Sequence, residues 1–111
     1  MSVKVLITSD PKYKGYPAWS FFKDTLVNLM SKIQYDHSVS INEIEIMSNI
    51  PMAVAWARKN NLKSYEFKED WNNVDRIIAF DSGNPKMKER IDKAKSFGLI
   101  VDIVKITLDK Q

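Results

Sequence analysis

Short apolar runs alternate along the chain with longer segments whose apolar residues recur every three or four positions. Runs rich in Val and Ile are typical of strands, and spacing of three or four residues is typical of helices. The pattern predicts strands at 3–8, 43–47, 62–67, 75–80 and 99–106. It predicts a helix at 18–34, a second that includes 53–57 and ends at 60–61, and a third at 86–97. Gly98 is a favourable C-terminal cap for the third helix.

Strands that alternate with helices favour a mainly parallel sheet covered on both faces. We therefore expect an α/β fold, a three-layer Rossmann-like domain with about five strands and about three helices. The runs 77–80 and 99–101 are almost continuously apolar, as strands buried on both faces usually are. With 111 residues the chain has room for one core, so we treat 1–111 as a single domain.

Polar residues follow three of the expected strands, and in a parallel sheet these three strand ends lie at one edge. Ligands of open α/β sheets bind beyond this carboxyl edge. The candidate ligand-binding residues are Ser9, Asp10, Ser48, Asn49, Asp81, Ser82, Gly83 and Asn84, with Lys12 and Lys86 available for a phosphate. Ser, Asp and Asn are also the preferred residues at helix starts, so capping is the competing explanation for each position.

Evidence for catalysis is thin, and we assign no catalytic residue. Phosphate sites favour glycine, yet the chain has no G-x-G-x-x-G and no P-loop, and Gly83 is the one glycine in a candidate loop. Asp10 and Asp81 could form a carboxylate pair for acid–base chemistry or for Mg²⁺, although capping or loop hydrogen bonds are favoured. His37, the single histidine, is expected on the surface.

Three aromatic side chains near the first loop have two interpretations. Tyr13, Tyr16 and Trp19 could cover a ring-shaped ligand, or they could close the core beneath a long loop. We favour the core.

Composition excludes several classes of protein. The chain has no cysteine, which rules out disulfides, a thiolate nucleophile and Cys-ligated metals. The net charge of +3 arises from 17 basic and 14 acidic residues that are interspersed, whereas nucleic-acid binders usually show a basic stripe. No apolar stretch reaches membrane-spanning length, and the run 3–7 is too short for a signal peptide. We expect a cytoplasmic protein without cofactor or metal, with neither membrane nor nucleic acid as partner.

Four segments carry a resemblance to a known family: Val5–Thr8, Ala53–Ala57, Asp70–Trp71 and Asp75–Phe80. Together they resemble the YspA-like branch of the SLOG superfamily. This resemblance implies a Rossmann-like domain that senses or processes nucleotides and nucleotide-derived ligands.

The chain departs from that family where a phosphate would be held. Ser9-Asp10-Pro11 replaces a Gly-Ser-Arg turn, and Ser48-Asn49-Ile50 stands where a Gly-Ala-Asp pattern is expected. The family's segment after Asp-Trp is largely missing, and Gly83 is the single retained glycine. The resemblance therefore implies a small, degenerate member.

Three hypotheses follow. The leading one is a non-catalytic binding domain for a nucleotide-derived small molecule or a protein partner, such as a phage-type decoy or inhibitor. The second is a nucleoside or nucleotide N-glycosidic bond hydrolase, or a deoxyribosyltransferase, that uses Asp10 or Asp81. The third is a protein-interaction module that inhibits a cellular enzyme through exposed aromatics such as Tyr13, Trp19 or Trp71. A homodimer is compatible with each of them.

Overall fold

The computed structural model describes residues 2–108, apart from the side chains of Tyr16 and Pro17. Its five-stranded sheet has the order β3-β2-β1-β4-β5, and every pair of neighbouring strands is parallel. The strands are β1 (Val3–Ser9), β2 (Ile44–Met47), β3 (Ser64–Tyr65), β4 (Arg76–Asp81) and β5 (Ile100–Lys105). The helices are α1 (Tyr16–His37), α2 (Pro51–Lys59) and α3 (Pro85–Ser96), with short 3₁₀ turns at Ile41–Glu43 and Trp71–Asn73.

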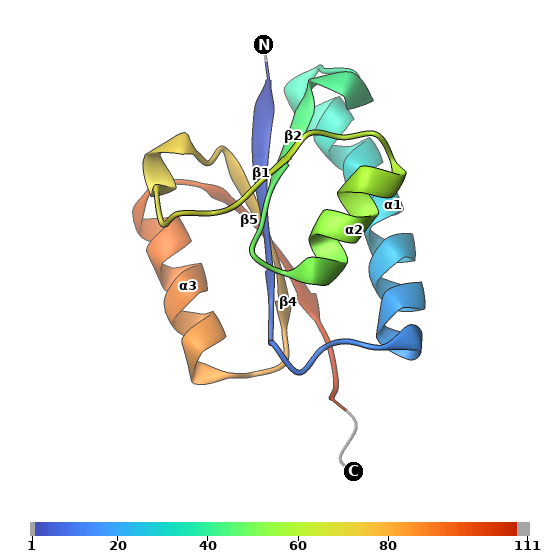
Figure 1. The fold of residues 1–111 in the computed structure, drawn as a ribbon. Helices are drawn as coiled ribbons and strands as arrows, with labels where there is room; N and C mark the ends of the chain where they lie inside the picture. Colours follow the sequence, from blue (N-terminus) through green and yellow to red (C-terminus); the bar gives the residue numbers. More distant parts are fainter. Residues whose placement is uncertain (1, 109–111) are drawn as a thin grey trace.

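Helices cover both faces of this sheet, with α1 and α2 on one side and α3 on the other (Figure 1). The predicted three-layer α/β fold is therefore confirmed, as is the order of strands and helices along the chain. Within residues 2–108, no helix is long and apolar enough to cross a membrane.

Two predicted element boundaries were wrong. The strand expected at 62–67 contains only two strand residues, both exposed, because it lies at the edge of the sheet and pairs with β2 alone. Helix α1 continues to His37, three residues beyond the predicted end. Asp36 of this last turn reaches Arg76 on β4, so a tertiary contact stabilises a helix end that looks turn-like in the sequence.

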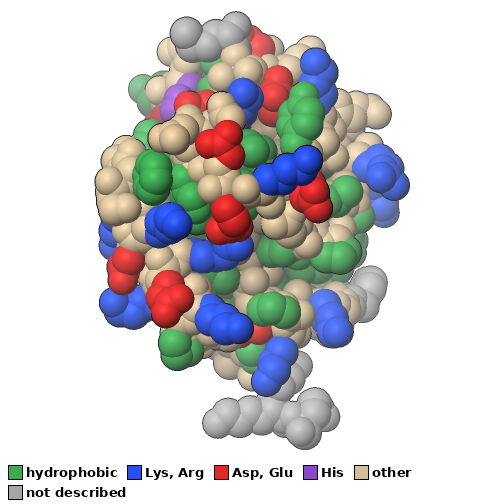
Figure 2. All heavy atoms as spheres, turned by 60° about the vertical axis from the view of Figure 1, so that its left-hand side comes forward, with side chains coloured by type: hydrophobic (Ala, Val, Ile, Leu, Met, Phe, Trp, Pro, Cys, Tyr) green, Lys and Arg blue, Asp and Glu red, His purple; other side chains and the backbone are tan. Residues whose placement is uncertain are grey.

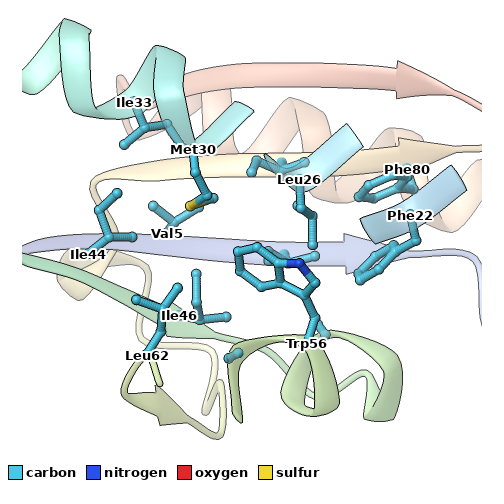
Figure 3. Close-up of a cluster of buried hydrophobic side chains, with 14 of the residues drawn as sticks. Val5, Phe22, Leu26, Met30, Ile33, Ile44, Ile46, Trp56, Leu62 and Phe80 are labelled. Carbon is cyan, nitrogen blue, oxygen red and sulfur yellow. The ribbon is translucent and has the colours of Figure 1, made fainter. Parts of the chain in front are cut away.

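The larger part of the core lies between the sheet and the α1–α2 layer. Figure 3 shows Trp56 of α2 and Leu26 of α1 converging on the strands, where Val5 and Ile46 meet them. At the carboxyl end of the sheet Phe22 packs against Phe80, with ring centroids 4.7 Å apart. These side chains are almost completely buried, because strand residues that alternate along β1 and β2 point toward the same layer.

Helix α3 closes the opposite face. Its buried residues are Met87, Ile91 and Ala94, which recur at helical spacing. Beside this helix the loop after β3 inserts Phe67 and Trp71, whose rings meet edge to face at 5.1 Å. The loop 66–73 thus completes the layer that α3 covers only in part.

A buried ionic cluster lies at the amino end of β4. The Arg76 side chain has no exposed surface, and it donates to Asp102 of β5 from Nε at 2.6 Å and from Nη2 at 3.1 Å. Its Nη1 donates to Asp36 of α1 at 2.9 Å. His37 was expected on the surface, but it is half-buried, with Nε2 3.5 Å from Nη1 of Arg76. The cluster joins α1, β4 and β5 far from the carboxyl edge.

Candidate functional site

The strand order places a topological switch point between β1 and β4. From β1 the chain passes to α1 on one face, and from β4 it passes to α3 on the other (Figure 1). The segments that leave the two strand ends therefore diverge, which opens a crevice where ligands of this architecture bind. Because all strands are parallel, the predicted strand ends at 9–10, 48–49 and 81–84 do share one edge.

A cleft of about 700 Å³ occupies this crevice. Small-molecule sites usually enclose about 300–1,000 Å³. Of the candidate residues, the structure places six in its lining: Ser9, Asp10, Lys12, Asn49, Asn84 and Lys86. It leaves four outside the lining: Ser48, Asp81, Ser82 and Gly83.

The Asp10 carboxylate connects the two loops across the switch point. Its Oδ1 accepts a hydrogen bond from the Lys12 backbone N–H at 2.8 Å, and its Oδ2 accepts from Ser82 Oγ at 2.8 Å and Asn84 Nδ2 at 3.1 Å. The pKa of Asp10 is lowered, chiefly by the Lys12 N–H, although burial acts in the opposite direction. Asp10 is thus an ionised carboxylate whose two oxygens are both engaged within the protein.

The loop after β4 is organised by capping and turn hydrogen bonds. Asn84 caps α3 by accepting from the Lys86 N–H at 2.8 Å, and Asp81 accepts from the Gly83 N–H at the same distance. Gly83 has a φ of 91°, a conformation that favours glycine. Asp10 bonds to Ser82 and Asn84, and Asp81 lies outside the lining of the cleft. No group of three His, Cys, Asp or Glu able to hold a metal occurs among residues 2–108.

The end of β2 is organised in a similar way. Ser48 Oγ donates to the Ile7 carbonyl at 2.6 Å and accepts from the Ile50 N–H at 3.1 Å. The Asn49 amide donates to the Phe67 carbonyl at 2.8 Å and accepts from the Phe67 N–H at 2.9 Å. Ser48 therefore joins β2 to β1, and Asn49 attaches the loop 66–73 to the rim of the cleft.

Several residues of the cleft were not among the sequence candidates. Two of them, Lys14 and Arg90, are basic, and an apolar wall is formed by Leu6, Ile50, Met52, Phe67 and Met87. Arg90 comes one helical turn after Lys86, so the spacing of four residues could have indicated that both face the same side of α3. Nothing in the local pattern of Lys14 distinguishes it from other surface lysines.

Charge in the cleft is mostly positive. Its lining contains four basic side chains, Lys12, Lys14, Lys86 and Arg90, and one acidic side chain, Asp10. The three lysines are exposed and form no ion pair within residues 2–108. Figure 2 shows acidic and basic groups interspersed over the face that carries α3, with several basic groups toward its lower end. The cleft therefore combines an apolar wall with cations suited to an anionic ligand.

The aromatic residues proposed as an exposed interaction surface are mostly internal. Tyr13 is buried and stacks on Phe80 at 5.8 Å, and Trp71 is only 3% exposed. Trp19 is half-buried and stacks on Phe22. The expectation of exposed aromatics was thus wrong for Tyr13 and Trp71, whereas Tyr13 and Trp19 help close the core as favoured. The side chain of Tyr16 lies outside the described part of the structure.

Comparison of the chain with protein-family models, with curated proteins and with solved structures gives no match in any of the three. The resemblance to the SLOG superfamily therefore stays a hypothesis.

Proposed function

We propose that the protein is a non-catalytic binding domain that holds a nucleotide-derived small molecule in the cleft at the switch point. The observation that carries the proposal is the set of four basic side chains around a cleft whose single carboxylate, Asp10, is already hydrogen-bonded. A ligand with phosphate would meet these cations, and its base would lie against the apolar wall. A protein that binds such a ligand without converting it would act by sensing or sequestering it.

Side chains rather than backbone groups would hold the phosphate. Helices α2 and α3 both begin with proline, which has no N–H to offer. In α3 the N–H groups of Lys86 and Met87 already bond to Asn84, and in α2 the N–H of Ala53 bonds to Ile50. Flexible lysines bind phosphate as point charges, so we expect affinity to fall steeply with salt.

The hydrolase and transferase alternative receives less support from the same geometry. A glycosidic bond cleaved by acid–base catalysis requires a carboxyl group that can reach the sugar and exchange a proton. Asp10 is the one carboxylate in the lining, its oxygens are engaged, and its pKa is lowered. A carboxyl group that is ionised at neutral pH is a poor proton donor there.

Calorimetric titration with nucleoside monophosphates, diphosphates and cyclic nucleotides at low salt tests the proposal. We compare the wild type with a variant in which Lys12, Lys14 and Lys86 are changed to Ala. The matched control carries Lys23→Ala, Lys63→Ala and Lys95→Ala, which remove the same charge from exposed sites outside the cleft.

We expect saturable binding that weakens about tenfold or more in the cleft variant and little in the control. Absence of heat with every nucleotide would refute the proposal, as would an equal loss in both variants. Release of free base by the wild type, faster than by Asp10→Asn, would favour the enzymatic alternative instead.

A further inference from the structure

The guanidinium of Arg90 is held at the wall of the cleft with part of its donor capacity unused. Its Cζ lies 5.6 Å from the ring centroid of Phe67 and 5.9 Å from that of Trp71, and its Nη2 pairs with Glu69 Oε2 at 3.1 Å. Nη1 is buried, yet it has no hydrogen-bond partner within the described residues. A buried donor on a charged group without an acceptor is costly, so the lack of a partner at Nη1 requires an explanation.

The shape of the guanidinium specifies what that partner is. Arginine presents two parallel N–H donors that match two oxygens of a phosphate or carboxylate. In the structure one of these positions is taken by Glu69, and the other is empty of protein acceptors among residues 2–108. Lys86 lines the same cleft one turn earlier on α3, so a second cation faces the same anion.

Glu69 is bound loosely enough to be displaced. Its side chain is 57% exposed, and ion pairs between exposed groups contribute little stability. Its backbone adopts a φ of 61°, an unusual conformation for a residue other than glycine, in a loop anchored by Asn49 through Phe67. The side chain can therefore leave Arg90 while the aromatic residues continue to hold the guanidinium.

We propose that Arg90 is the anion-binding residue of the cleft and that Glu69 is a built-in competitor, which a terminal phosphate of the ligand displaces. This inference rests on the proposed function only in taking the ligand to be a nucleotide. The anion site at Arg90 does not depend on that identity. In the free protein Glu69 pairs with Nη2 of Arg90, and in the complex a phosphate oxygen takes its place. Because Nη1 is buried, this second arm is engaged only once the departure of Glu69 uncovers it.

The test compares Arg90→Gln and Glu69→Gln, each with a control of equal charge change. Arg58→Gln removes a cation on α2 outside the cleft, and Glu66→Gln removes an exposed acid from the segment that carries Glu69. Adenosine 5′-monophosphate is titrated by calorimetry. Inorganic phosphate is titrated while the Arg90 Nε–H signal is followed by NMR, with that signal assigned by its loss in Arg90→Gln.

We expect Arg90→Gln to weaken binding of adenosine 5′-monophosphate about tenfold or more, because a charge-assisted hydrogen bond is lost. We expect Glu69→Gln to tighten it about two- to fivefold, since an exposed ion pair no longer competes. Affinity changes of opposite sign in the two variants would indicate that Glu69 competes with the ligand. If the Arg90–Glu69 pair were only structural, both variants would weaken binding. If Arg90→Gln does not fold, Arg90→Lys keeps the charge without the paired donors and should weaken binding several-fold.

The outcomes separate the two proposals. Unchanged affinity in Arg90→Gln, or weaker binding in Glu69→Gln, would overturn the inference while nucleotide binding stands. A phosphate-dependent shift of the Arg90 signal without any nucleotide affinity would refute the proposed function and support the anion site. No response to either probe would refute both.

Discussion

The buried guanidinium of Arg76 predicts that removing its acceptor Asp102 destabilises the protein more than removing Arg76 itself. Asp102 accepts two of the three carboxylate hydrogen bonds to Arg76, and Asp36 accepts the third. Burial acts to lower the pKa of Arg76, but the bonds to Asp102 and Asp36 outweigh it and raise the pKa. Arg76 is therefore charged at all ordinary pH values, and Asp102→Ala would leave that charge inside the protein.

The structure sets the size of the effect. Two charge-assisted bonds at about 1.5–3 kcal/mol each suggest a loss of about 3–6 kcal/mol. This agrees with the roughly 3–5 kcal/mol for breaking a buried pair by removing one partner. Asp36, which would remain, is 34% exposed and cannot replace a buried acceptor fully. Arg76→Met also removes one partner, but it leaves Asp102 with Lys32 only 3.4 Å away, so we expect it to cost less than Asp102→Ala.

Urea unfolding followed by tryptophan fluorescence measures these free energies. Asp92→Ala serves as the control, because its pair with Lys88 is exposed and its loss should change stability by less than about 0.5 kcal/mol. The double variant Arg76→Met/Asp102→Leu should recover most of the stability that Asp102→Ala loses. Equal destabilisation by Arg76→Met and Asp102→Ala would contradict this prediction, as would a double variant that is no more stable than Asp102→Ala.

Three further predictions concern the loops at the carboxyl edge. Folding lowers the pKa of Asp10, so its carboxylate should stabilise the protein at pH values above the ordinary pKa of 3.8, and this contribution should disappear as pH falls through the lowered folded-state pKa. The difference in unfolding free energy between the wild type and Asp10→Asn should therefore shrink below about pH 4. A difference that grows there would contradict this prediction. Asn84→Ala should cost about 1–2 kcal/mol in urea unfolding, since it removes the α3 cap and a bond to Asp10; a change within error would refute the capping role. Asn49→Ala should speed hydrogen exchange at the Phe67 amide, and protection equal to the wild type would show that the loop does not depend on Asn49.

Much of the fold could be predicted from local patterns. Residues 77–80 are apolar without interruption because β4 is covered by helices on both faces, so the sequence itself indicates a central parallel strand. Met87, Ile91 and Ala94 could be assigned to the buried side of α3 from their spacing alone. The strand ends shared an edge, as expected, because that follows from parallel order and requires no side-chain detail.

Local patterns indicated where the candidate site lies, but not which residues form it. Six polar candidates line the cleft, yet the groups that give it charge and shape include Lys14, Arg90 and Phe67, which were not among the sequence candidates. In the sequence, Arg90 is one of several cations on a charged helix. It becomes a candidate anion site only where the loop 66–73 brings Phe67, Glu69 and Trp71 around it.

By itself the sequence determined the order of strands and helices, because burial periodicity is a local property. The alternation of strands with helices then indicated a parallel sheet and the edge of that sheet at which a ligand would bind. Only the tertiary structure decided which polar groups at that edge are engaged. Asp10 bonds to Ser82 and Asn84, which are 72 and 74 positions away, and Arg76 is enclosed by Asp36 and Asp102 from two other elements. A polar side chain takes its partners from whatever the fold brings within hydrogen-bond distance. Spacing along the chain therefore does not reveal that Asp10 is engaged while Nη1 of Arg90 has no partner among the described residues.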